Sequence, residues 1–275
     1  FTAQQPEDIR SIIQGSAKKT CCLDSIPAVL LKEQIVLDSI VPILTSIINL
    51  SMETGIVPLC FKGAVITPVL KKPNANANEL KNYRPISNIC FPAKVMERVV
   101  AKQITDHMSM HNLHDPLQSA YKRGSSTETA LLHVKTQLDR FLDQGSAALM
   151  IFLDLSAAFD TLDHDLLLRR LHEQVGISGI ALSWIESYLS GRKQTVRVDE
   201  NTSDPADLTI GVPQGSVMGP ILFLWYLLPL REIIERHGIS RHSYADDLQL
   251  FCPLNLKDEV QCSDQIRKMP RWRLV

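Results

Sequence analysis

Carboxylates that follow apolar runs are the residues of this chain best suited to do chemistry. Asp154 comes directly after the apolar run 147–153, and Asp246 and Asp247 lie between two β-rich runs. An unpaired acid at the rim of a core is costly, and two carboxylates about 4 Å apart repel by about 4 kcal/mol at an effective dielectric of roughly 20. Divalent cations relieve this repulsion. Because these are oxygen ligands with no Cys or His nearby, they favour Mg²⁺ or Mn²⁺ over zinc.

Carboxylates that share two divalent ions are typical of phosphoryl transfer. One ion lowers the pKa of an attacking hydroxyl, while the other holds the phosphates and the leaving oxygen. Each motif alone also has a simpler interpretation, because an Asp at a helix N-cap and an Asp-Asp turn occur in any fold. Asp154, the glycine-containing turn 211–215 and the Asp246–Asp247 doublet occur in this order, which favours catalysis.

The elements that must position these acids are helices and strands in mixed order. Apolar periodicity predicts helices over 26–37, 38–53, 91–110, 125–142, 164–174, 179–189 and 216–235. Strands are predicted over 64–70, 83–86, 147–153, 194–198, 240–244 and 248–252. Pro68 implies an edge position, the all-apolar run 147–153 implies a buried strand, and Pro229 should kink the last helix. Ser125 and Glu128 form a potential capping box, and the order of elements indicates an α+β domain.

The charge is unevenly distributed, although the net charge of the whole chain is only −1. Residues 61–125 contain ten Lys or Arg and four acids, a net of +6, whereas 1–60 sum to −2 and 126–275 to −5. A basic segment ahead of an acidic one suits a polyanion track beside a metal-binding centre, and a solvated charged face is equally compatible.

The cysteines and the apolar runs indicate the cellular compartment of the protein. The six cysteines form no C-x-x-C pair, so we expect reduced structural thiols and an intracellular protein, nuclear or cytoplasmic and not secreted. The apolar stretch 35–50 is interrupted by Asp38 and Pro42, and no secretory leader begins at Phe1. We therefore expect no membrane partner.

Taken together, the motifs resemble the reverse transcriptases of non-LTR (LINE-type) retrotransposons. The segments that carry the resemblance are FLDLSAAFD at 152–160 (motif A), GVPQGSVMGP at 211–220 (motif B), YADD at 244–247 (motif C), the finger motifs at 61–72 and 82–87, and the block QSAY…STE at 118–128. They occur in family order between residues 26 and 252. The resemblance implies an RNA-directed DNA polymerase that uses an RNA template, a DNA primer and deoxynucleoside triphosphates.

The resemblance also implies a right-hand polymerase fold, with fingers and a palm whose antiparallel sheet is flanked by helices. Asp154 and Asp246 would lie on adjacent strands as ligands of two Mg²⁺ ions, with Mn²⁺ as an alternative. Asp247 would lie beside them, and the backbone carbonyl of Leu155 would help to hold the second ion.

Nucleotide contacts are expected at several further positions. Phe159 occupies the family's gate position, where a bulky ring would exclude a 2′-hydroxyl and select deoxynucleotides. Arg84 would grip the triphosphate, with Lys72, or Lys71, as a second cation. Without the motifs, the Phe would be an ordinary core residue and the cations ordinary surface residues.

The turn of motif B should approach the nucleotide through its backbone. Gly215 permits a close approach, and Gln214 can reach the nucleotide or the template without adding charge. A lone G-x-P-x-G is only a turn, and the flanking β-rich run and helix supply the expected context.

The resemblance divides the chain into an N-terminal helical extension (1–60), fingers (61–145), a palm (146–252, with 164–210 partly fingers) and a divergent tail (253–275) where the thumb is expected to be missing. That departure leaves open a catalytically dead remnant that binds nucleic acid or a partner. An RNA-dependent RNA polymerase is disfavoured by Phe159, and an unrelated two-metal nuclease by the 211–216 block. The oligomeric state is left open.

Overall fold

The computed structural model of the chain describes residues 1–122, 124–155 and 157–268. Arg123 of the basic segment, Ser156 of motif A and the end of the tail (269–275) lie outside the described residues. The chain forms two compact units. Unit 1 comprises residues 1–113 and 159–225, and unit 2 comprises residues 114–158 together with the chain from Tyr226 onward.

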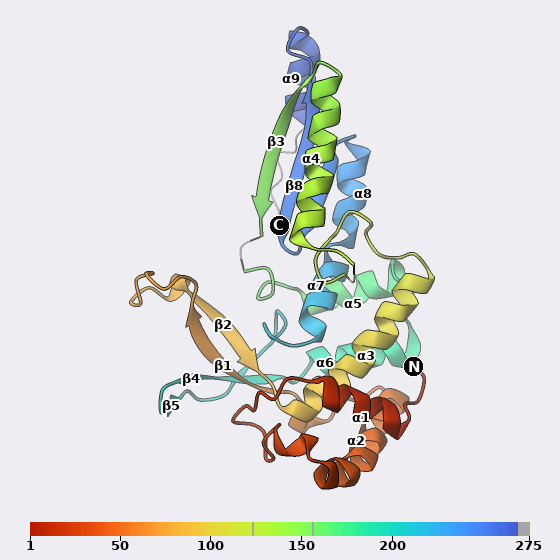
Figure 1. Cartoon of the computed structure of the whole chain (residues 1–275), viewed down its shortest axis with the longest axis vertical. Coiled ribbons are helices and arrows are strands. Elements are labelled where there is room, and N and C mark those ends of the chain that lie inside the picture. Colours follow the sequence, from red (N-terminus) through yellow and green to blue (C-terminus); the bar gives the residue numbers. More distant parts are fainter. Residues whose placement is uncertain (123, 156, 269–275) are drawn as a thin grey trace. The chain divides into compact units, whose positions relative to one another are not determined.

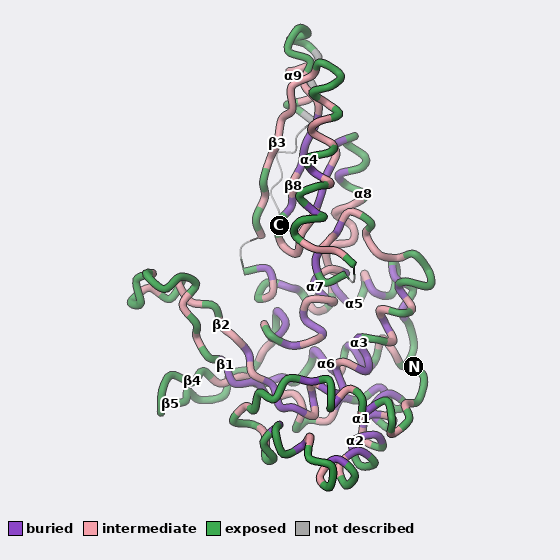
Figure 2. The backbone as a smooth tube through the Cα atoms, viewed as in Figure 1, coloured by how far each residue is buried: buried purple, intermediate pink, exposed green. Residues whose placement is uncertain are grey.

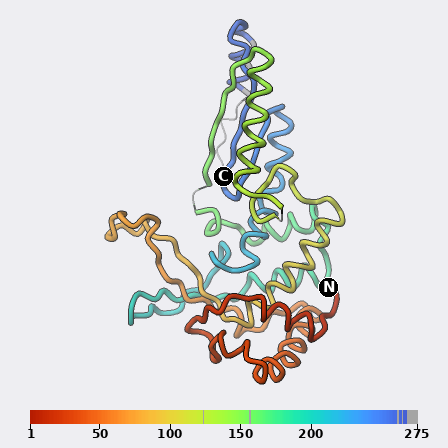
Figure 3. The backbone as a smooth tube through the Cα atoms, viewed as in Figure 1, coloured from red at the N-terminus to blue at the C-terminus, as the bar shows by residue number. Residues whose placement is uncertain are grey.

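Unit 2 is built on an antiparallel sheet of three strands in the order β3-β8-β7. Strands β3 and β8 run beside each other in Figure 1. Its elements are α4 (Thr127–Asp143), β3 (Ala147–Asp154), α8 (Leu228–Arg236), β7 (Ser240–Tyr244), β8 (Asp247–Leu254) and α9 (Glu259–Lys268). Strands β3 and β8 are about a hundred residues apart in the sequence and lie side by side (Figure 3). Helices α4 and α8 pack against β7, and α9 packs against β8.

One core cluster of unit 2 lies on one face of this sheet, while Phe251 on the other face is fully buried and contacts Phe141 of α4. Leu248, Leu250 and Cys252 of β8 are buried in this cluster with Ile234 of α8 and Ile239. Alternating residues of β3 pack on the same cluster. The expectation that β3 is a buried strand is wrong, because β3 is an edge strand and Phe152 on its other face is 69% exposed. Figure 2 shows this difference between a largely buried β8 and a half-exposed β3.

Unit 1 combines a mixed sheet with helices. Its strands are β1 (Gly63–Leu70), β2 (Tyr83–Asn88), β4 (Lys193–Val198), β5 (Asn201–Thr202) and β6 (Ala206–Asp207), in the order β2-β1-β4-β5 with β6 also pairing with β4. Its helices are α1 (Pro6–Gly15), α2 (Gln34–Thr54), α3 (Phe91–Met110), α5 (His164–Glu173), α6 (Gly179–Leu189) and α7 (Met218–Tyr226), with short 3₁₀ turns η1 (Leu30–Lys32), η2 (Leu59–Phe61) and η3 (Leu80–Asn82). Trp184 and Tyr188 of α6 are fully buried and stacked at a centroid distance of 5.6 Å.

Pro68 sits where the sheet of unit 1 can accept it. Strand β1 pairs in parallel with β4 only over Gly63–Ile66, while it pairs with β2 over Val65–Leu70. Beyond Ile66 one side of β1 is therefore an edge, as Pro68 predicted, although the first half of the strand is central.

Most predicted elements differ by a few residues at their ends, and three predicted helices differ in ways that have a clear physical reason. Of the predicted helix 26–37, residues 30–32 form η1 and residues 34–37 belong to the first turn of α2, because Glu33 is extended and acts as the N-cap of α2. The N-cap of α4 is Ser126, whose capping box uses Thr129, instead of the predicted pair one residue earlier. The predicted helix 216–235 breaks into α7 and α8, because Pro229 lacks an N–H and its ring would clash with the carbonyl of Trp225.

Among the described helices, only α2 is long and apolar enough to cross a membrane, with a mean hydropathy of 1.8 over its best window. The helix continues through Asp38 and Pro42, the two residues that interrupt its apolar stretch. Its buried side chains include Leu37, Val41 and Ile48, and the helix packs against α1 and α6. A packed face of this kind is typical of a core helix.

Candidate active site

The three acids lie at one end of the sheet of unit 2. Asp154 is the last residue of β3, and its Cα partner in the antiparallel register is Asp247, the first residue of β8. Tyr244 pairs with Asp247 across the β7–β8 hairpin, so Ala245 and Asp246 form a two-residue turn. The expected hairpin with acids at its tip is therefore present, and it places the doublet next to the end of β3.

The turn that carries Asp246 is strained. Ala245 has a φ of 55°, and Asp246 is not among the residues with positive φ. Glycine is the residue normally found where the first central residue of a two-residue hairpin turn has a positive φ. A side chain in this conformation costs about 1–2 kcal/mol, and such strain is commonly found at functional sites.

The acids affect one another electrostatically. Burial raises the pKa of Asp247, and the negative charges of Asp246 and Asp154 raise it further. The pKa of the Tyr121 hydroxyl is also raised, by burial and then by the charge of Asp246 and by Tyr244. The doublet and Asp154 therefore repel one another, as expected of ligands that share cations.

The donor set fits a hard divalent cation, because it consists only of carboxylate oxygens. Within the residues that the structure describes, however, no three His, Cys, Asp or Glu side chains gather closely enough to hold a metal ion. The backbone register thus brings the acids to one place, and their side chains do not form a closed cage. Leu155, expected to contribute its carbonyl, directly follows β3.

The motif B turn is held in unit 1 by backbone contacts. Gly211 has a φ of 82°, and a Cβ there would lie 2.7 Å from the carbonyl oxygen of Phe159. Gly215 has a φ of 109°, and a Cβ there would lie 3.0 Å from the carbonyl oxygen of Ser87. The close approach expected of Gly215 is therefore made to β2, where the N–H of Ser87 also donates to the carbonyl of Gln214 at 2.7 Å.

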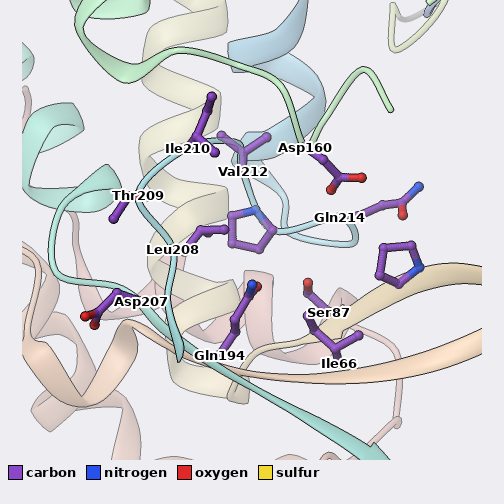
Figure 4. A pocket seen from close by; sticks show the side chains of 12 residues that line it. Ile66, Ser87, Asp160, Gln194, Asp207, Leu208, Thr209, Ile210, Val212 and Gln214 are labelled. Carbon is purple, nitrogen blue, oxygen red and sulfur yellow. The ribbon is translucent and has the colours of Figure 1, made fainter. Parts of the chain in front are cut away.

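A pocket of about 290 Å³ in unit 1 adjoins this turn (Figure 4). Ser87 and Gln194 line it from the strands, while Asp160 and Gln214 lie on the opposite side. Burial raises the pKa of Asp160. Gln214, predicted to contact a nucleotide, thus lines a cavity that also offers a carboxylate, a hydroxyl and a second amide.

The other predicted nucleotide contacts also lie in unit 1. The ring of Phe159 is half-buried and packs on Phe223 at a centroid distance of 5.2 Å, so it has a packing role whether or not it acts as a gate. Arg84 is exposed on β2 opposite Val69, and Lys72 is exposed in the loop after β1. Within the described residues, no ion pair involves either cation.

Sequence reasoning missed Glu97, a fully buried acid of α3. Its carboxylate accepts hydrogen bonds from the N–H groups of Val217 (2.6 Å) and Met218 (3.2 Å) at the start of α7, and from the hydroxyl of Tyr188 (3.1 Å). Burial raises the pKa of Glu97. Glu97 therefore anchors the helix that follows the motif B turn, and its only sequence signal was an acid between the apolar positions Val95, Met96 and Val99 of the helical pattern.

Comparison with known proteins identifies the class. The family model described as "Reverse transcriptase (RNA-dependent DNA polymerase)" matches residues 70–272, well over half of the chain. The chain therefore belongs to the reverse transcriptase family.

The relatives of this chain narrow its class to the reverse transcriptases of mobile elements. The "Probable RNA-directed DNA polymerase from transposon X-element" of Drosophila melanogaster is 30% identical over 74% of this chain and 22% of its own length. The "Probable RNA-directed DNA polymerase from transposon BS" of the same species is 27% identical over 79% of this chain and 24% of its own length. The expectation of a LINE-type retrotransposon reverse transcriptase domain is confirmed, and the chain spans about a quarter of the length of these relatives.

A solved structure shares the fold. Apo telomerase from Candida tropicalis, truncated from its C-terminal domain, aligns with a TM-score of 0.55 and 13% identity over 77% of this chain and 47% of that chain. The expected α+β class is confirmed, and the likeness is consistent with a polymerase fold.

Proposed function

We propose that the chain contributes the catalytic centre for RNA-templated DNA synthesis by two-metal nucleotidyl transfer in a retrotransposon. The observation that carries the proposal is the register of unit 2, in which Asp154 lies directly opposite Asp247, next to the turn that bears Asp246. Family membership supports it, because relatives that share these motifs are named RNA-directed DNA polymerases.

In this proposal the acids of unit 2 hold the metal ions. Asp154 and Asp246 would bind both Mg²⁺ ions, or Mn²⁺, with Asp247 beside them and the carbonyl of Leu155 as a further ligand of the second ion. Such ions would activate the primer hydroxyl and neutralise charge on the phosphates. The protein's own part is to hold these acids close together, against the repulsion that raises the pKa of Asp247.

The substrate contacts belong to the same proposal. Arg84 and Lys72, exposed and outside any ion pair within the described part of the chain, would bind the triphosphate. Phe159 would select deoxynucleotides, and Gln214 and Gly215 would line the nucleotide or template.

The layout of fingers (61–145) and palm (146–252) and the intracellular location follow from the family. The basic segment 61–125 would bind the phosphates of the RNA template and the DNA primer. This segment contains Arg84 and Lys72, the two exposed cations assigned to the triphosphate. It also overlaps the block at 118–128.

Primer extension on an RNA template with Mg²⁺ and deoxynucleotides tests the proposal. The chain should extend the primer, and Asp246→Asn should reduce extension by roughly 10³-fold or more, as expected when a metal ligand at the reacting centre is lost. Asp199→Asn, which removes the same charge at an exposed turn in unit 1, should leave the rate unchanged. Salt-sensitive binding of RNA without extension would instead assign the chain to the non-catalytic class of retroelement remnants.

A further inference from the structure

The turn that presents the acid doublet is held by one side chain from a distant part of the sequence. The N–H of Ala245 donates to Oε1 of Gln118 at 2.9 Å, and the carbonyl of Ala245 accepts from Nε2 of Gln118 at 3.2 Å. Gln118 is only 8% exposed, and its Oε1 also accepts the N–H of Ala120 at 2.9 Å. One carboxamide therefore binds both backbone groups of the strained residue.

We propose that Gln118 is a positioning residue that holds Ala245 in its left-handed conformation and so aims Asp246 and Asp247. The catalytic part of this inference rests on the proposed function. Backbone groups at the tip of a two-residue turn have no partner strand, so in the absence of Gln118 they would be solvated and the turn could relax. The direction of the acid doublet depends on the φ of the residue before it.

The chemistry of the contact requires a carboxamide. Only Asn and Gln offer a donor and an acceptor side by side at neutral charge, and Gln has the longer reach. A Glu at this position would accept from the N–H of Ala245 but could not donate to its carbonyl when ionised. It would also add a negative charge close to Asp246.

The segment that carries Gln118 is itself fixed to the sheet of unit 2. Gln118 forms a parallel bridge with Ser243 of β7, where the N–H of Ser119 donates to the carbonyl of Ser243 (3.0 Å) and the N–H of Ser243 donates to the carbonyl of Leu117 (2.9 Å). The hydroxyl of Ser119 also contacts Nε2 of His242 at 3.0 Å. These contacts bind the segment to the free edge of β7.

A buried ion pair secures the start of the same segment. The guanidinium of Arg241 makes two hydrogen bonds to the carboxylate of Asp115, at 2.6 and 2.8 Å, and its side chain is only 2% exposed. Two parallel bonds of this kind fix orientation as well as distance. The position of Gln118 is therefore set by buried contacts on both sides, which is what a positioning residue needs.

The test combines Gln118→Leu with Ala245→Gly, because a glycine adopts positive φ without a side-chain penalty. The first readout is hydrogen exchange at the Ala245 amide, which does not depend on activity. Gln118→Leu should accelerate this exchange by roughly tenfold or more, as expected for the loss of the bond to Oε1. Gln137→Leu, in α4 of the same unit, is the matched control and should not change it.

The second readout is function, measured as Mn²⁺ affinity and as kcat for primer extension. Gln118→Leu should lower kcat by roughly 10- to 30-fold, the equivalent of two hydrogen bonds, and should weaken Mn²⁺ binding in parallel. In an Ala245→Gly background, Gln118→Leu should lower kcat several-fold less. A glycine at this position adopts the positive φ without the contact to Gln118. A purely structural role would show no such rescue.

The outcomes separate this inference from the proposed function. Unchanged exchange at Ala245 in Gln118→Leu, or an equal loss of kcat in both backgrounds, would overturn the positioning role. If the unmodified chain neither binds Mn²⁺ nor extends a primer while exchange at Ala245 still depends on Gln118, the proposed function fails and the contact that holds the turn is supported. Gln118→Glu provides a second variant, in which exchange should stay slow while kcat falls.

Discussion

Replacing Asp247 by Asn should stabilise the metal-free chain and strongly reduce its stabilisation by Mg²⁺. Asp247 and Asp154 are directly opposed across β8 and β3, and both are exposed. Removing one charge relieves the repulsion between them, while Asn keeps the size and the polar character of the side chain. A structural acid would show the opposite behaviour, since its removal would break a favourable contact.

The size of the gain follows from the register. Opposed residues on neighbouring antiparallel strands have Cβ atoms about 5 Å apart, and like charges at that distance in bulk water repel by about 0.8 kcal/mol. The bulk-water limit applies because both side chains are exposed. The free energy of unfolding of Asp247→Asn should therefore exceed that of the unmodified chain by about 0.5–1 kcal/mol at neutral pH and low salt, and by less at high salt.

The difference in the free energy of unfolding between Asp247→Asn and the unmodified chain should also depend on pH in a defined direction. The pKa of Asp247 is raised in the folded chain, so the folded chain binds a proton at a pH where the unfolded chain has lost it. The destabilisation by Asp247 is therefore present above its folded pKa and disappears as the pH falls below the ordinary Asp range, near 3.9. Over the same range the stability of Asp247→Asn should converge with that of the unmodified chain.

Urea denaturation followed by circular dichroism, with and without Mg²⁺, measures both effects. Mg²⁺ at about one hundred times its dissociation constant should stabilise the unmodified chain by about 2.7 kcal/mol, and Asp247→Asn by much less. Asp199→Asn serves as the charge control. A loss of stability in metal-free Asp247→Asn, or equal stabilisation of both chains by Mg²⁺, would refute the reasoning.

Glu97→Gln should remove part of the pH dependence of stability. Burial raises the pKa of Glu97, so the free energy of unfolding falls as the pH rises from about 4.3 to the folded pKa, and denaturation at several pH values should show a flatter curve for the variant. Gly211→Ala should lower the free energy of unfolding by more than about 2 kcal/mol, because a Cβ there would lie 2.7 Å from the carbonyl oxygen of Phe159. Thermal melts measure the loss, and Gly63→Ala is the control, because a Cβ at Gly63 meets no atom within 4 Å. Phe159→Ala should increase the use of ribonucleotides relative to deoxynucleotides by about tenfold or more in primer extension; an unchanged ratio would leave the ring only its packing on Phe223.

Local signals predicted most of the elements that carry the site. Helix α3 has the predicted bounds, 91–110, because its apolar spacing is strong and Pro92 occupies its first turn. The β7–β8 hairpin was predicted because β-rich runs flank a two-residue turn with an acid at its tip. In both cases the determining interactions lie within a few residues along the chain.

Features that depend on distant partners could not be predicted. Glu97 and Gln118 find hydrogen-bond partners about 120 residues further along the chain, so neither the helical pattern around Glu97 nor the 118–128 block predicts what these side chains contact. The partial burial of β3 has the same origin, since an all-apolar strand does not reveal whether it lies at the centre or at the edge of its sheet. The approach of Gly215 to Ser87 also joins segments far apart in the sequence, and the assignment of Gly215 to a nucleotide stays a prediction.

The position of the acids is determined by the core of unit 2 and not by the acids themselves, which repel one another. Leu248 and Leu250 of β8 face the buried cluster, and a slip of one residue in the pairing with β3 would turn both side chains to the opposite face. The lost burial would cost about 1.5–3 kcal/mol for each leucine, several times the repulsion between two exposed carboxylates. The apolar alternation that packs the sheet therefore also keeps Asp247 opposite Asp154, and a variant that weakens this alternation should lose metal binding before it loses its fold.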